Sequence, residues 1–64
     1  MMTEQEKSEL NSQLNEALMQ IIQAQKYLKQ SDFIRSGVYL GTVQDLLPKV
    51  HFKLLTANRK QHTH

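Results

Sequence analysis

The sequence has no cysteine, only one proline and only two glycines among its 64 residues. Without cysteine the chain can form neither a disulfide nor a thiolate zinc site, which fits a reducing compartment. No apolar run approaches the roughly 18 residues of a membrane-spanning helix. The stretch TEQEKSEL at 3–10 is polar where a signal peptide would be apolar. We therefore expect a cytoplasmic protein that does not enter the membrane.

Residues suited to catalysis or metal binding are also scarce. The serines are isolated, there is no glycine-rich phosphate loop, and no two carboxylates are expected to converge in a pocket. The only histidines are His51, His62 and His64, and the last two lack a third fixed ligand nearby. Asp32 and Asp45 are interpreted as turn or cap residues. The sequence predicts no enzyme, no metal site and no cofactor.

The short length limits how the chain can be stabilised. A protein of this size forms one domain and buries a smaller share of its surface than a larger one. Disulfides and metals often compensate in small proteins, but this chain has neither to offer. Association with another chain remains, so we expect a homo-oligomer, first of all a dimer.

The first half of the sequence predicts one helix over about 4–30. Thr3 and Glu6 have the spacing of a capping box, in which each side chain binds a free backbone N–H group. Apolar residues then recur at alternating spacings of four and three, which is typical of helices packed almost parallel or antiparallel. They are Leu10, Leu14, Ala17, Ile21, Ala24 and Leu28. Leu18 and Ile22 widen this stripe beyond what one neighbouring helix would cover.

The segment 31–37, SDFIRSG, is predicted to be the turn. Ser31 and Asp32 favour turns or caps, and Gly37 can adopt a positive φ angle. Phe33 and Ile34 are expected to form a hydrophobic plug at the end of the hairpin.

A second helix is predicted over about 38–58, followed by a frayed tail at 59–64 that lacks apolar periodicity. Its apolar stripe keeps one phase on both sides of Pro48, which indicates one kinked helix. The stripe consists of Leu40, Val43, Leu47, Val50, Leu54 and Ala57. An alternative makes Asp45 an N-cap and begins a separate helix near Leu46.

Charge is distributed unevenly along the chain. Residues 1–16 contain four glutamates and one lysine, a net charge of −3, whereas residues 49–64 contain four basic residues and no acid. If the helices run antiparallel, the basic end of the second lies beside the acidic start of the first. Each surface ion pair contributes only about 0 to 1 kcal/mol, so the pattern favours an orientation more than it adds stability.

These patterns predict an all-α protein, an antiparallel two-helix hairpin that dimerises into a four-helix bundle. The expected oligomer interface consists of Leu10, Leu14, Ala17, Leu18, Ile21, Ile22, Ala24, Leu28, Leu47, Val50 and Leu54. Met19, Tyr39 and Phe52 are predicted to contact a partner protein.

The opening stretch TEQEKSELN, residues 3–11, resembles the start of the Rop family of small plasmid RNA-binding proteins. That resemblance implies a dimer of helical hairpins that grips paired RNA loops with the exposed face of its first helices. The family's RNA-contacting positions would fall on Glu4, Asn11, Asn15, Met19 and Lys26. Of these, Asn11 and Lys26 are of the expected kind, whereas Glu4 and Asn15 depart from the family pattern. The second half of the chain shows no such likeness.

Three functional hypotheses follow. The first is a non-enzymatic protein–protein interaction module, a regulator, inhibitor or chaperone of bacterial or phage type. The second is an RNA- or DNA-binding dimer, whose affinity would fall steeply with salt as counterions are released. Its candidate residues are Asn11, Lys26, Lys29, Arg35, Lys49 and Lys53. The third is one subunit of a heterodimeric secretion-type chaperone, which would be partly unfolded without its partner.

Overall fold

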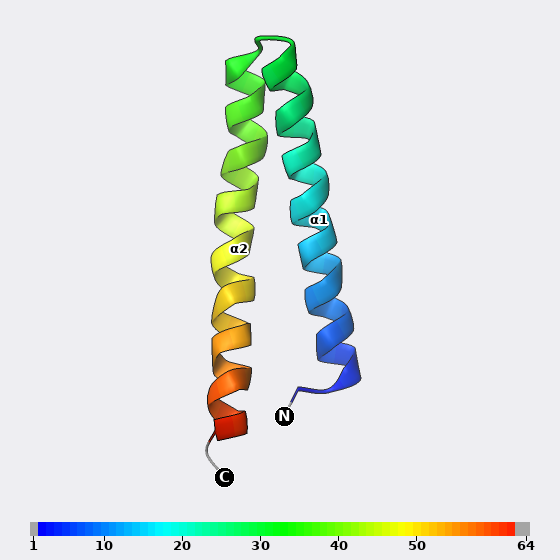
Figure 1. Ribbon diagram of the computed structural model, residues 1–64, viewed down its shortest axis with the longest axis vertical. Helices are drawn as coiled ribbons and strands as arrows, with labels where there is room; N and C mark the ends of the chain where they lie inside the picture. The colour runs from blue at the N-terminus through cyan, green and yellow to red at the C-terminus, as the bar shows by residue number, and fades with distance from the viewer. Residues whose placement is uncertain (1, 63–64) are drawn as a thin grey trace.

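The protein is an antiparallel hairpin of two long helices and has no strand within residues 2–62, the part of the chain that the computed structural model describes. Helix α1 spans Glu4–Lys29 and helix α2 spans Phe33–His62 (Figure 1). The molecule measures 51 × 17 × 12 Å, so its length is about that of one helix. The predicted all-α hairpin is confirmed.

The capping box predicted at the start of α1 is present. The Glu6 backbone N–H donates to Thr3 Oγ1 at 3.1 Å, and the Thr3 N–H donates to Glu6 Oε1 at 3.2 Å. Two backbone donors that the helix itself cannot use are thereby satisfied. Two acids in the first turn and two lysines in the last, Lys26 and Lys29, also suit the direction of the helix dipole.

The turn is shorter than the predicted segment 31–37, because α2 already begins at Phe33. Asp32 caps the N-terminus of α2. The Arg35 N–H donates to Asp32 Oδ1 at 3.1 Å, and the Ser36 N–H donates to the Asp32 carbonyl at 3.1 Å. The chain reverses at Ser31, whose φ is 60°, while Gly37 lies within α2 and has no positive φ. The expectation that Gly37 would make the turn was therefore wrong.

Phe33 and Ile34 do not form the expected plug. They are 68% and 82% exposed in the first turn of α2, because an early helix start directs them away from α1. Both remain apolar side chains in contact with solvent within the isolated chain.

Helix α2 runs through Pro48 without interruption, so no second helix starts near Leu46. Pro48 is exposed, and the backbone hydrogen bond that it cannot donate is lost on the solvent side. The helix also continues to His62, beyond the expected end at 58, since 58–62 contains neither glycine nor proline. The last two residues of the predicted tail, 63–64, lie outside the described part of the chain.

The core is one row of side chains from each helix. Leu10, Ala17 and Ala24 of α1 and Val43 and Val50 of α2 are buried, and within each helix they recur every seven residues. Their small size lets the helices approach closely near the turn, where the Ser36 hydroxyl donates to the Ala24 carbonyl at 2.8 Å. The helices diverge toward the open end of the hairpin (Figure 1).

Replacing Val50 by alanine tests this core. Val50 is 2% exposed, so Val50→Ala should lower the free energy of unfolding by about 2 kcal/mol through lost burial and an unfilled space. Val38 is 64% exposed on the same helix, and Val38→Ala should change it by less than about 0.5 kcal/mol. Urea unfolding followed by circular dichroism, at one fixed chain concentration, measures both. Equal losses in the two variants would contradict the assignment of the core.

The turn offers a second test. A non-glycine residue with positive φ is strained, so Ser31→Gly should raise the free energy of unfolding by about 0.5 to 1 kcal/mol. The matched substitution Ser12→Gly, in the middle of α1, should lower it by about 0.5 kcal/mol because glycine is a poor helix former. The same unfolding experiment applies, and a loss of stability in Ser31→Gly would exclude a left-handed Ser31.

Candidate association surface

A second apolar row runs along each helix and is exposed. It lies four residues after the buried row: Leu14 follows Leu10, Ile21 follows Ala17, and Leu47 follows Val43. We call the complete set the apolar face; its members are Leu14, Ile21, Leu28, Phe33, Leu40, Leu47 and Leu54. Their exposed fractions range from 36% for Ile21 to 68% for Phe33. Few large apolar side chains are this exposed together in a protein that remains a monomer.

Both halves of the apolar face lie on the same side of the hairpin. Both helices are right-handed, but their chains run in opposite directions. Viewed from one end of the hairpin, the chain therefore turns clockwise along one helix and anticlockwise along the other. Positions four residues after the buried row consequently point to the same side of the hairpin in both helices. The Ser36–Ala24 hydrogen bond sets the level of the two helices. Leu40 then lies level with Ile21, and Leu47 lies level with Leu14, which makes the apolar face continuous along the hairpin.

The opposite side of the hairpin is mainly polar and aromatic. Positions three residues after the buried row are Gln13, Gln20 and Tyr27 on α1 and Leu46 and Lys53 on α2, of which only Leu46 is aliphatic. Near the turn the rings of Tyr27 and Tyr39 stack with their centroids 5.5 Å apart and their planes 6° from parallel. A hairpin that is apolar on one side and polar on the other can bind a partner through its apolar side while its polar side stays in contact with water.

The tyrosine stack carries two cations. The Lys26 ammonium lies 5.8 Å and the Arg35 guanidinium 5.6 Å from the centre of the Tyr27 ring. Arg35 also pairs with Asp32 at 3.5 Å. These contacts join residues of α1, the turn and α2 on the polar side of the hairpin, next to the turn.

The structure divides the predicted oligomer interface into two groups. Leu10, Ala17, Ala24 and Val50 are buried inside the hairpin itself. The other predicted residues are exposed: Leu14, Leu18, Ile21, Ile22, Leu28, Leu47 and Leu54. Phe33 and Leu40 belong to the apolar face but were missing from the prediction. Leu40 precedes Leu47 by seven residues and Phe33 precedes it by fourteen, and this repeat is the signal that would have found them.

The residues predicted to contact a partner protein have different surroundings. Met19 is 64% exposed and Phe52 is 67% exposed, and both lie outside the apolar face. Tyr39 is half-buried and its ring is stacked on Tyr27, so it contributes to the packing of the hairpin.

The residues proposed for nucleic-acid binding do not gather in one place. Lys26, Lys29 and Arg35 lie at the loop end, whereas Lys49 and Lys53 lie in the other half of α2. The sixth candidate, Asn11, lies in the first half of α1. These side chains therefore do not form one compact basic cluster.

The two ends of opposite charge lie side by side, but no ion pair links them among the described side chains. Lys7 pairs with Glu4 at 2.9 Å, and Arg35 pairs with Asp32, each within one turn of chain. Neither Lys49 nor Lys53 has an ion-pair partner among residues 2–59. Over residues 2–59, direct ion pairs with the start of α1 therefore do not neutralise Lys49 or Lys53.

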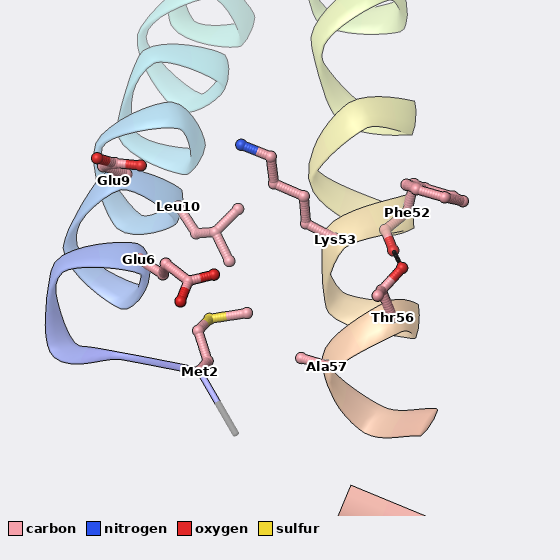
Figure 2. A pocket seen from close by; sticks show the side chains of 8 residues that line it. All are labelled: Met2, Glu6, Glu9, Leu10, Phe52, Lys53, Thr56 and Ala57. Atoms are coloured by element: carbon pink, nitrogen blue, oxygen red, sulfur yellow. Dashed lines mark hydrogen bonds between the residues drawn. The ribbon is translucent and has the colours of Figure 1, made fainter. Parts of the chain in front are cut away.

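A cavity of about 240 Å³ opens between the diverging ends of the helices. Figure 2 shows the Lys53 side chain reaching across it toward Glu9 and Leu10, with the Met2 sulfur at its lower side. Its lining residues are Met2, Glu6, Glu9, Leu10, Phe52, Lys53, Thr56 and Ala57. The Thr56 hydroxyl donates to the Phe52 carbonyl at 2.9 Å, within the part of α2 that lines the cavity.

Within residues 2–59 no three histidine, aspartate or glutamate side chains cluster as metal ligands would. Neither helix combines the length and the apolar character that crossing a bilayer demands, over the part of the chain described. The described residues do form an extended apolar face.

Comparison with known proteins shows one informative similarity. The chain is 37% identical over 54 residues to a protein in the Mu-like prophage FluMu region of Haemophilus influenzae. The match covers 84% of this chain and 95% of that protein. The chain belongs to the family of that prophage-region protein. No family model and no solved structure matches it.

Proposed function

We propose that this protein is a non-enzymatic protein–protein interaction module that works as a dimer. Two hairpins join through their apolar faces into a four-helix bundle, and the dimer presents its outer surface to another protein. The observation that carries the proposal is the continuous, one-sided apolar face.

The surface area of the chain supports association. Its accessible surface is 5292 Å² for a mass of 7.5 kDa. A folded monomer of that mass typically exposes about 4,250 Å². The excess of about 1,000 Å² is close to the roughly 800 Å² that each partner buries in a standard protein–protein interface. A second copy covering the apolar face would bring the surface into the ordinary range.

The spacing of the apolar face also favours a four-helix bundle. Residues of each helix alternate between the buried row and the apolar face at spacings of four and three, as in bundles whose helices cross at small angles. Each helix then contacts its neighbour in the same hairpin with one row and the second copy with the other. One repeat would thus serve both contacts.

Two exposed side chains outside the apolar face are candidates for contact with another protein. Met19 on α1 and Phe52 on α2 would remain on the outside of the bundle, and both types are common at docking surfaces. The similarity to a protein in a prophage region supports a role of bacterial or phage type. A small regulator, inhibitor or chaperone fits this combination, and the expected location is the cytoplasm.

Sedimentation equilibrium tests the assembly. The chain should have twice its monomer mass at micromolar concentration. Leu47→Glu places a charge in the middle of the apolar face of both copies and should weaken the dimer by about 100-fold or more, since the loss of each buried leucine costs about 2 kcal/mol or more. Met19→Glu, on the outer side of α1, is the matched control and should leave the dimer intact. A compact wild-type monomer across this concentration range would refute the proposal.

A further inference from the structure

The apolar face also indicates how the two hairpins are oriented, an inference that rests on the proposed dimer. We infer that the copies lie with their turns at opposite ends, so that α1 packs along α1 of the second copy and α2 along α2. Two hairpins stacked face to face with two-fold symmetry have only one other arrangement, in which both turns lie at the same end and α1 packs along α2.

The apolar row of α2 fits the opposite-end arrangement along its length, whereas on α1 Leu28 comes to lie over Lys7 of the second copy. On α2, Phe33, Leu40, Leu47 and Leu54 are spaced by seven, so the row reads the same when it is reversed. Phe33 then lies over Leu54 of the second copy, and Leu40 over Leu47. At the same level, Leu14 on α1 lies over Ile21 of the second copy. The same-end arrangement also pairs apolar residues here. The residues that flank the apolar face must therefore distinguish the two arrangements.

The apolar border of α2 favours opposite ends. Ile34 and Leu55 each follow a member of the apolar face by one residue, and they are 82% and 43% exposed. With turns at opposite ends, Ile34 lies beside Leu55 of the second copy, so each covers the other. With turns at the same end, Ile34 lies instead beside Lys29 of the second copy and remains next to a charge.

The charges on α1 favour the same choice. Opposite-end packing brings Lys29, near the end of α1, close to Glu4 and the acidic first turn of the second copy. Same-end packing instead leaves Lys29 beside Ile34 of the second copy and far from that acidic turn. Opposite charges placed together favour association. Charge and apolar complementarity therefore select one orientation.

Cysteine cross-linking can distinguish the arrangements, because the chain has no cysteine of its own. Four variants carry one cysteine each: Leu14→Cys, Ile21→Cys, Leu40→Cys and Leu47→Cys. Two variants at a time are mixed, left until their dimers have exchanged subunits, and then oxidised. The disulfide-linked heterodimers are quantified by non-reducing electrophoresis and mass spectrometry. A disulfide requires Cα atoms within about 7 Å, so only neighbouring positions link efficiently. Circular dichroism of each variant establishes that it is folded.

The expected result is that 14 with 21 and 40 with 47 give several-fold more heterodimer than 14 with 47 and 21 with 40. The reverse preference would overturn the inference and establish turns at the same end. Because the pairs on α1 and α2 are independent, one poorly folded variant does not prevent a decision. Met19→Cys is the outward-facing control and should not cross-link efficiently with any of the four.

Failure of the inference is separable from failure of the proposed function. If sedimentation shows a dimer but none of the four mixtures links above the Met19→Cys background, the apolar faces are not opposed and the orientation inferred here is wrong. If sedimentation shows a monomer at every concentration, the proposed dimer itself is refuted.

Discussion

Two helices share only one contact line, and this limit governs the rest of the structure. In this hairpin the line is filled by Leu10, Ala17 and Ala24 against Val43 and Val50. These side chains are mostly small, so the helices approach closely near the turn but bury little apolar area. The larger apolar residues are in the next row around each helix, which α1 and α2 cannot cover for one another. The most extensive apolar surface of the chain therefore faces outward.

Because that surface lies on one side only, the two sides of the hairpin differ in polarity. On one side the apolar face continues along the hairpin, while the other side carries glutamines, Lys53 and the stacked pair Tyr27 and Tyr39. A single partner can cover the apolar side and leave the polar side in water. With no cysteine to form a disulfide, covering this side is the available route by which such a short chain can gain stability. This is why the proposed function begins with association and not with a pocket.

Much of the fold could be predicted from local patterns. The capping box at Thr3 and Glu6 marked the start of α1, and the unbroken phase around Pro48 indicated one second helix. The turn could not be located in the same way. Gly37 had the stronger intrinsic preference for a turn, but Asp32 caps the helix before it and Ser31 accepts a positive φ. A preference of one residue was outweighed by hydrogen bonds that satisfy the start of a 30-residue helix.

By itself, the sequence determined that the chain forms two helices with apolar residues at alternating spacings, because helical periodicity and capping are local properties. Only the tertiary structure decided which apolar residues are inside. Leu10 and Leu14 look alike in the repeat, yet one is 5% and the other 44% exposed. The difference arises from the rotation of each helix about its axis when the two pack together. That rotation depends on contacts between residues far apart in the chain, such as Ser36 with Ala24, which no local spacing can reveal.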